Sequence, residues 1–268
     1  MASFSVVSNI ASANAQSNLQ QTNMGLNKAL SRLSSGFRIN QSGDDAAGLA
    51  VANSYRNDQA ILNQGIRNAN DGLSKLQIKD SAMANIATIL DRMATLATQA
   101  ASSTDSAVLT KLSSEFNTLT TEIDREAAVA GMTQTATFSV FVSLETTVSN
   151  GGVSGSIDGV DTTDLGITTT TFTTAAQAQT VLALVDTAIS NLGNRQNAVG
   201  TLQNRLQFAI SLAQSQVVNT KAAESRIRDA NIAEESANMT RFNILSQSGI
   251  AALAQANQTS SAVLALLR

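Results

Sequence analysis

In the first half of the chain, apolar residues recur at spacings that alternate between four and three positions. The stripe consists of Leu62, Ile66, Ala69, Leu73 and Leu76, then of Met83, Ile86, Leu90, Met93, Ala97 and Ala100, with the charged Asp80 between the two runs. An average repeat of about 3.5 residues is the period of coiled coils. The chain contains no proline that would break such a helix. Because Asp44 or Asp45 can cap its first turn, we predict a helix over residues 45–101, roughly 85 Å long.

Two further stripes of the same kind predict the partners of this helix. Ser102, Ser103 and Thr104 interrupt the first pattern, so the chain can fold back there. The second stripe contains Leu109, Leu112, Phe116, Leu119 and Ile123. The third contains Val181, Val185, Ala188 and Leu192, then Val199, Leu202, Leu206, Ala209 and Ala213, with Arg195 in register but polar. We therefore predict an antiparallel helical bundle shaped as a rod.

Both ends of the chain are uncharged and have narrower stripes. Residues 1–27 and 242–267 contain no charged side chain. Their apolar positions are Leu19, Leu26, Leu30 and Leu33 near the start, and Met239, Phe242, Leu245, Leu253 and residues 263–267 near the finish. Short isolated helices are marginal in water. These ends are therefore either disordered tails or helices that pair with each other or with copies in other subunits.

The pattern changes between about residues 131 and 174. Phe138, Val140, Val142 and Leu144 alternate with other side chains, as in a strand. Asn150-Gly151-Gly152 is typical of a turn, and the threonines at 168–171 and 173–174 favour strands. Residues 126–194 contain six acidic residues and no lysine or arginine. We predict a mainly α fold with a small, acidic, β-rich insertion.

Composition argues against several classes of protein. The chain has no cysteine and no histidine, and therefore lacks thiol chemistry and the commonest general base and zinc ligand. A net charge of −3 argues against binding to nucleic acids or anionic membranes. Neither neutral end contains the roughly 20 apolar residues of a membrane span. The N-terminus also lacks the positive segment of a secretory signal.

The stretch SGFRINQSGDDAAGLAVANSYR, residues 35–56, could be a ligand loop, a metal site or a piece of architecture. A phosphate loop would need GK[ST] after a strand, and neither is present. Asp44 and Asp45 alone supply too few oxygens for Ca²⁺, which takes about six or more. The chain also lacks GxSxG, SxxK and HExxH motifs. We predict no catalytic residue, metal or cofactor, and interpret the stretch as architecture.

Several blocks of the sequence resemble those of bacterial flagellins and occur in the same order. LSSGFRIN (33–40) followed by DDAAGLAVA (44–52) resembles the family's N-terminal signature. The later blocks are RNANDGLS (67–74), EIDR (122–125), LQNRL (202–206), SRIRDANIAEE (225–235), LAQANQ (253–258) and the terminal VLALLR. The resemblance covers roughly residues 1–125 and 164–268. Ordered blocks at both ends make it far more specific than any single motif.

The resemblance implies a division of the chain into segments. These are an N-terminal coiled coil and spoke (1–43), the first half of a rod (44–130), a short outer insertion (131–174), the second half of the rod (175–222) and a C-terminal coiled coil (223–268). In flagellins the spoke connects the coiled coil to the rod. Its residues Arg38, Asn40, Asp44 and Asp45 are the expected contacts with neighbouring subunits. The insertion is shorter than is common in the family, and glycosylation of its Ser and Thr side chains is open.

By the same resemblance, the expected function is that of a structural subunit that self-assembles into the flagellar filament, the helical propeller of swimming bacteria. The chain would leave the cell unfolded through the flagellar type III system. Its expected partners are other copies of itself, the filament cap, the hook-associated junction proteins and an export chaperone. A hook–filament junction protein is the alternative that shares these termini. A secreted coiled-coil adhesin or an enzyme fits less well, because the insertion is small and no catalytic motif is present.

Two sets of residues are candidates for contacts between molecules. The predicted assembly residues are those of the terminal stripes: Leu26, Leu30, Leu33, Phe242, Leu245, Leu253 and Leu264. In many flagellins an Arg, a Leu and a Glu of the rod bind an animal Toll-like receptor, and the matching positions are Arg92, Leu96 and Glu115. The residues around Arg92 depart from the family's usual pattern. Axial packing between subunits is the simpler role for these three.

Overall fold

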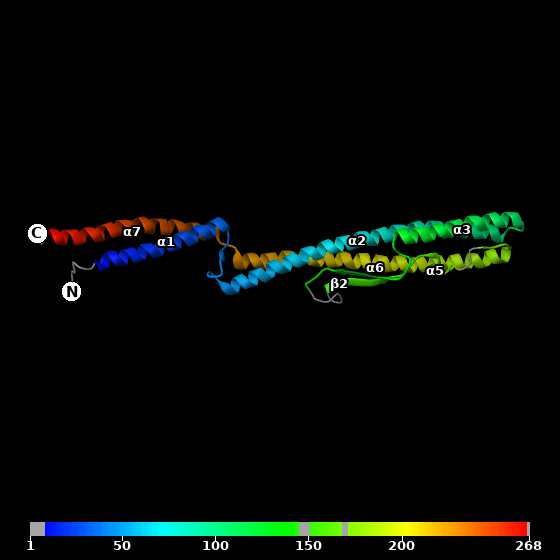
Figure 1. Cartoon of the computed structure of the whole chain (residues 1–268), viewed down its shortest axis with the longest axis horizontal. Helices are drawn as coiled ribbons and strands as arrows, with labels where there is room; N and C mark the ends of the chain where they lie inside the picture. Colours follow the sequence, from blue (N-terminus) through cyan, green and yellow to red (C-terminus); the bar gives the residue numbers. More distant parts are fainter. Residues whose placement is uncertain (1–8, 145–150, 168–170, 267–268) are drawn as a thin grey trace. The chain divides into compact units, whose positions relative to one another are not determined.

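The computed structural model describes residues 9–144, 151–167 and 171–266, with side chains described up to residue 258. Its elements in chain order are α1 (Ile10–Ser35), α2 (Ala46–Ala101), α3 (Ser106–Val129), β1 (Ala136–Phe141), β2 (Gly152–Ile157), α5 (Thr162–Leu165), α6 (Ala175–Arg228) and α7 (Ile232–Leu266) (Figure 1). The chain divides into two compact units. We call residues 58–218 the rod unit, and residues 1–57 with 219–268 the terminal unit.

Helix α2 confirms the prediction from the first stripe. It covers 56 residues, and the Asp45 carboxylate caps it by accepting a hydrogen bond from the Gly48 N–H at 2.8 Å. The predicted stripe is buried almost throughout, and Leu62, Leu76 and Leu90 are fully inaccessible to solvent. Asp80 is exposed, while Ala82 and Met83 are buried next to it. One charged position therefore leaves the burial of the stripe intact.

Helix α3 folds back along α2, as the interrupted pattern predicts. Asp105 caps it by accepting from the Ala107 N–H at 2.8 Å. Lys79 of α2 donates to the Gly131 carbonyl at 3.1 Å, and Arg92 of α2 pairs with Glu115 of α3 at 2.6 Å. These two contacts fix an antiparallel register.

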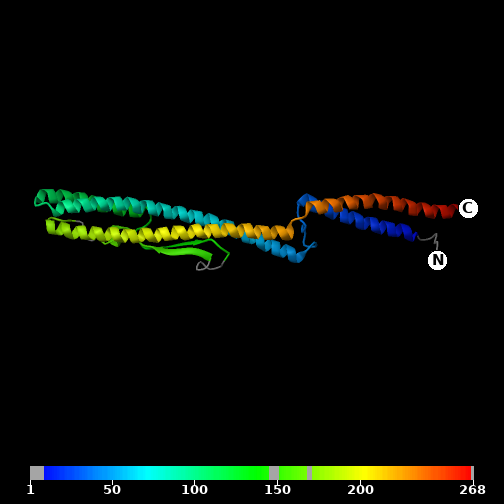
Figure 2. The same cartoon turned by 180° about the vertical axis from the view of Figure 1, so that it is seen from behind.

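Helix α6 completes the rod unit with the third stripe. In both views it runs alongside α2 and α3 (Figures 1 and 2), and one core contains side chains from all three helices. The polar stripe position Arg195 lies at the edge of that core and donates to the Asp164 carbonyl oxygen at 2.6 Å. Just before α6, Phe172 meets Phe116 of α3 edge to face, with ring centroids 5.7 Å apart.

The β-rich insertion is a two-stranded antiparallel hairpin packed against the rod. Strand β1 pairs with β2 from Ala136↔Ile157 to Phe141↔Gly152. Glycines allow the close approach, because a Cβ on Gly65 of α2 would lie 2.2 Å from the Val142 carbonyl oxygen. A Cβ on Gly155 of β2 would lie 2.7 Å from the Leu202 side chain of α6. The hairpin therefore belongs to the core of the rod unit.

Three details of the predicted insertion are wrong. Strand β1 ends at Phe141, so Val142 and Leu144 lie beyond it. Gly152 begins a strand where we predicted a turn. Thr171, Thr173 and Thr174 are not in a strand; the Thr174 hydroxyl oxygen instead accepts from the Gln177 N–H at 3.3 Å at the start of α6. Capping a long helix thus outweighs the β propensity of threonine here. Residues 145–150 and 168–170, which include Asn150, lie outside the described residues.

In the terminal unit, α1 and α7 pair with each other in antiparallel register. The Phe242 ring of α7 packs over Gly25 of α1, where a Cβ would lie 2.7 Å from it. Leu19 of α1 packs against Gly249 of α7 in the same way, because a Cβ on Gly249 would lie 3.2 Å from the Leu19 side chain. At the far end Asn9 donates to the Ala256 carbonyl at 2.9 Å. Of the two pairings left open by the stripes, pairing within one chain is therefore the one observed.

Candidate functional site

The α1–α7 pair leaves much of its apolar surface exposed. Leu30 is 53% exposed and Leu245 46%, and Met24, Ile244 and Ile250 are more than half exposed. Leu26, Leu33, Phe242 and Leu253 are half-buried. The predicted assembly residues therefore divide into two groups, one turned partly into the pair and one facing solvent. The side chain of Leu264 lies outside the described part of the chain.

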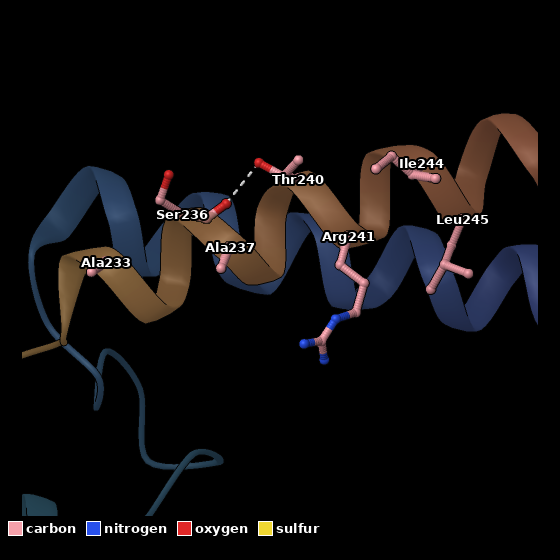
Figure 3. A pocket seen from close by; sticks show the side chains of 7 residues that line it. All are labelled: Ala233, Ser236, Ala237, Thr240, Arg241, Ile244 and Leu245. Carbon is pink, nitrogen blue, oxygen red and sulfur yellow. Dashed lines mark hydrogen bonds between the residues drawn. The ribbon is translucent and has the colours of Figure 1, made fainter.

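A groove of about 590 Å³ runs along this exposed surface of α7 (Figure 3). Its lining comes from α7 alone: Ala233, Ser236, Ala237, Thr240, Arg241, Ile244 and Leu245. Thr240 donates its hydroxyl back to the Ser236 carbonyl at 2.9 Å, so this hydroxyl is satisfied within the helix. Arg241 makes no ion pair with any residue that the structure describes. The groove thus combines small and apolar side chains with one free cation at its side.

A charged cluster ties the loop before α2 to α1. The Lys28 ammonium lies 2.6 Å from the Asp44 carboxylate, whose side chain is only 6% exposed. The backbone N–H groups of Asn40 and Gln41 also donate to this carboxylate, at 3.2 and 3.4 Å. The hydrogen bond from Lys28 is the largest cause that lowers the pKa of Asp44 below its ordinary value. Asp44 thus organises the loop as an ion, while its neighbour Asp45 caps α2.

The other side of this loop is joined to the end of α6. The Arg38 N–H donates to the Arg228 carbonyl at 2.6 Å, and the Ala230 N–H donates to the Gly36 carbonyl at 2.9 Å. The Arg38 guanidinium donates to the Ile227 carbonyl at 2.8 Å. The Arg228 guanidinium lies 4.1 Å from the centre of the Phe37 ring, in a cation–π contact. We call residues 36–45 together with 227–230 the clasp.

A partly buried ion pair links the two terminal helices next to the clasp. Arg32 of α1 lies 2.9 Å from Glu235 of α7, which is one of the few buried polar residues of the described chain. The sequence pattern alone did not predict four residues of these contacts: Lys28, Arg32, Arg228 and Glu235. A usable signal was present, because these are among the charges that flank the two neutral ends.

The predicted spoke residues all have partners within the same chain. Arg38, Asp44 and Asp45 make the contacts described above, and Asn40 donates its side-chain amide to the Ser31 hydroxyl at 2.9 Å. Of the three receptor candidates, Arg92 and Glu115 form an exposed ion pair. Leu96 is 1% exposed and packs in the rod core, so its side chain does not present a surface. Contacts of these residues with other molecules stay predictions.

The structure contains no helix, in its described ranges, that is long and apolar enough to cross a membrane. The same residues contain no group of acidic side chains arranged to hold a metal ion.

Comparison with known proteins identifies the family to which a chain with these features belongs. The profile of the bacterial flagellin N-terminal helical region matches residues 6–139, and that of the C-terminal helical region matches residues 182–267. The chain belongs to the bacterial flagellin family. It is 37% identical to a flagellin of Halalkalibacterium halodurans over 92% of this chain and 95% of that protein. A flagellin of Listeria monocytogenes is 33% identical, over 95% of this chain and 96% of its own.

One further relative extends over nearly the whole chain, and a solved structure covers part of it. A flagellin of Treponema pallidum is 32% identical over 97% of this chain and 98% of its own. The crystal structure of Bacillus cereus flagellin aligns with 59% of this chain and 94% of its own, at 28% identity and a TM-score of 0.47. Family membership confirms the mainly α fold with a small insertion. It also makes this chain a structural protein, a subunit of the flagellar filament.

Proposed function

We propose that the exposed apolar face of the α1–α7 pair is the surface through which copies of this chain lock together in the filament. The observation that carries the proposal is the exposure of Leu30, Ile244 and Leu245 on helices whose pairing is already complete within one chain. A hydrophobic stripe that stays exposed after intramolecular pairing favours association with further copies.

The energetics favour association over leaving these side chains in water. Full burial of a Leu or Ile side chain contributes about 1.5–3 kcal/mol. Such burial offsets only part of the ordering of the terminal helices, which costs on the order of 1–2 kcal/mol per residue fixed from a disordered state, and the pairing of α1 with α7 and their helical hydrogen bonds contribute the rest. The absence of charge from residues 1–27 and 242–267 removes a desolvation cost that charged side chains would add.

The domain organisation follows the same proposal. Residues 1–43 and 223–268 form the coiled-coil domain and spoke, residues 44–130 and 175–222 the rod, and residues 131–174 the outer insertion. Export in unfolded form through the flagellar type III system, with the help of a chaperone, would deliver the chain to the extracellular filament. The filament cap and the hook-associated junction proteins would be its other partners. A chain without cysteine or proline suits this route, because neither disulfides nor slow prolyl isomerisation delays folding after export.

Substitutions that place a charge on exposed residues of this surface test its role in assembly. Leu245→Asp and Leu30→Asp place a carboxylate on the exposed face without removing a buried side chain. We expect either variant to keep the helicity of the wild type but to lose filament formation, measured by sedimentation and electron microscopy. Ile189→Asp is the matched control, because Ile189 is a partly exposed apolar residue of the rod unit. Unchanged filaments of both terminal variants would refute the proposed surface.

Assembly of the purified wild-type chain distinguishes a filament subunit from a hook–filament junction protein. A filament subunit propagates, so we expect long tubes to grow from this chain alone after heating and cooling. A junction protein would instead cap or adapt existing filaments and would give short assemblies that stop growing.

Recognition by a Toll-like receptor is a separate proposal that concerns the exposed pair Arg92 and Glu115. A reporter-cell assay compares the wild type with Arg92→Ala and Glu115→Ala. A reduced signal from both variants supports receptor contact. If the wild type gives no signal, the remaining role of the pair is packing within the rod or between subunits.

A further inference from the structure

The sequence contains two Asp-Gly pairs, and the structure places them in different surroundings. Asp71-Gly72 lies inside α2, and Asp158-Gly159 follows the last residue of β2, outside any helix or strand. In an Asp-Gly pair the glycine nitrogen can close a five-membered ring with the aspartate side chain, because glycine has no Cβ to obstruct the approach. The backbone around each pair therefore decides which of the two can react.

The helical pair is held away from this reaction. An α-helix directs each Cβ toward its N-terminus and engages each interior N–H in a hydrogen bond to the carbonyl four residues earlier. The Gly72 nitrogen lies in the interior of a helix of 56 residues, so the Asp71 side chain is directed away from it. A Cβ on Gly72 would lie 2.7 Å from the Val140 side chain, which shows that the hairpin packs on this turn. The pair should stay intact for as long as α2 is folded.

The pair after β2 lacks that protection. Asp158 is exposed, and its carboxylate accepts hydrogen bonds from the Thr135 hydroxyl at 3.2 Å and the Ser156 hydroxyl at 3.4 Å. A hydroxyl can accept as well as donate, so both partners are compatible with the protonated carboxyl group that ring closure needs. A Cβ at residue 159 would collide with an Asp164 carboxyl oxygen. The packing therefore favours glycine at the position where ring closure needs it.

We propose that Asp158 is a site of spontaneous isomerisation to isoaspartate. The Gly159 nitrogen attacks the side-chain carboxyl carbon of protonated Asp158, a C–N bond forms, and the carboxyl hydroxyl leaves with the amide proton as water. The cyclic imide then takes up one water. Hydrolysis at the main-chain carbonyl gives isoaspartate, whose Cβ is now part of the backbone, and hydrolysis at the other carbonyl restores aspartate. The overall change needs no oxidant or cofactor and leaves the mass unchanged.

Isoaspartate does not fit the native connection between β2 and α5. On one side, Ile157 is 2% exposed and pairs with Ala136 in the ladder. On the other, Val160 is fully buried and donates its N–H to the Met132 carbonyl at 2.8 Å. Isoaspartate adds one carbon to the main chain between these two anchored residues. Either the end of the ladder or the Val160 hydrogen bond must then break, so isomerisation should loosen the hairpin from the rod core.

Ageing of the intact chain followed by peptide mapping tests the proposal. The purified protein is incubated for weeks and digested with an endoproteinase that cleaves before aspartate but not before isoaspartate. In the folded protein we expect progressive loss of cleavage before Asp158 without a change in mass, and complete cleavage before Asp71. The loss should be faster in mildly acidic than in neutral buffer, because the carboxyl group must be protonated. In urea, where α2 is unfolded, cleavage should be lost before both residues.

Two variants of Asp158 are the matched controls. Asp158→Glu keeps the charge but would need a larger ring, so it should stay intact and keep its urea midpoint on ageing. The midpoint of the aged wild type should shift to lower urea. Asp158→Asn should react through the same ring with loss of ammonia, and yield isoaspartate faster. Deamidation at Asn150 raises the mass of its peptide and is thereby counted separately.

Complete cleavage before Asp158 after ageing would overturn the proposal. Equal loss of cleavage before Asp71 and Asp158 in the folded protein would overturn it as well, because the fold would then not select the site. An equal shift of the urea midpoint in aged Asp158→Glu would contradict the expected effect of isoaspartate on the hairpin.

Discussion

The rod unit and the terminal unit are built from helices with similar apolar stripes, but only the rod unit encloses a core. In the rod unit three helices and a hairpin surround the stripes, and residues such as Leu90, Phe116 and Val185 are fully buried. In the described part of the terminal unit, the buried hydrophobic residues are Ala29, Ile39 and Ala52. The same stripe thus becomes a core or an open surface according to how many partners one chain supplies.

The largest effect expected from this comparison comes from truncating one leucine in each unit. Leu90→Ala leaves a cavity in a closed core and should lower the free energy of unfolding of the rod unit by about 2–5 kcal/mol. Leu245→Ala removes an exposed side chain and should change the stability of the unassembled chain by less than about 0.5 kcal/mol. Urea unfolding followed by circular dichroism measures both. Equal losses would mean that the two units do not differ as described.

A glycine contact tests how tightly the hairpin is packed onto the rod. The Cβ of Gly65→Ala would collide with the Val142 backbone at 2.2 Å, and backbone is unable to move as easily as a flexible side chain. We expect a loss of about 1–3 kcal/mol in the stability of the rod unit. Gly193→Ala in α6 is the matched control, since nothing lies within 4 Å of its Cβ position. It should stabilise by about 0.5–1 kcal/mol through helix propensity, and a loss of the same size at both sites would count against the tight hairpin contact.

One carboxyl group in each unit should respond to acid in the opposite direction to the other. The pKa of Asp44 in the terminal unit is lowered, chiefly by the hydrogen bond from Lys28, so its contribution to stability is present at neutral pH and is lost as pH falls through that pKa. Asp164 in the rod unit has a raised pKa, first because of desolvation and then because of Asp161. Its contribution is present in acid and is lost as pH rises through the raised pKa.

Carboxyl-carbon NMR titration measures both groups directly. We expect Asp44 to titrate below and Asp164 above the ordinary value of 3.8. Asp44→Asn should reduce the stability that the terminal unit loses in acid. Asp164→Asn should remove the stability that the rod unit gains in acid. If the pKa values of both carboxyl groups were shifted in the same direction, the predicted difference between Asp44 and Asp164 would be wrong.

The smallest effect concerns the exposed ion pair between α2 and α3. Arg92 and Glu115 are 2.6 Å apart, but their side chains are 56% and 44% exposed. A double-mutant cycle with Arg92→Ala and Glu115→Ala should give a coupling of about 0.2–1 kcal/mol that decreases with added salt. A coupling of several kcal/mol that is insensitive to salt would show that this contact determines the stability of the rod.

The sequence predicts the elements that depend on local pattern better than those that depend on distant contacts. The stripe from Leu62 to Ala100 and the cap at Asp45 are local, and both α2 and its start are correct. The pairing of β1 with β2 and the capping role of Thr174 were missed, because they depend on where the rod accepts the hairpin and where α6 begins. The clasp was missed for the same reason, since Arg38 and Arg228 are distant in sequence. The assembly role of Leu30 and Leu245 stays a prediction.

Hydrogen exchange of the free subunit and of the filament tests the central claim most directly. The terminal helices lack a core within one chain, so we expect the amides of α1 and α7 to exchange much faster in the free subunit than in the filament. The buried amides of α2 and α3 in the rod unit should be protected in both states. Equal protection of α1 and α7 in the free subunit and the filament would contradict the proposal that other copies cover and stabilise this helix pair.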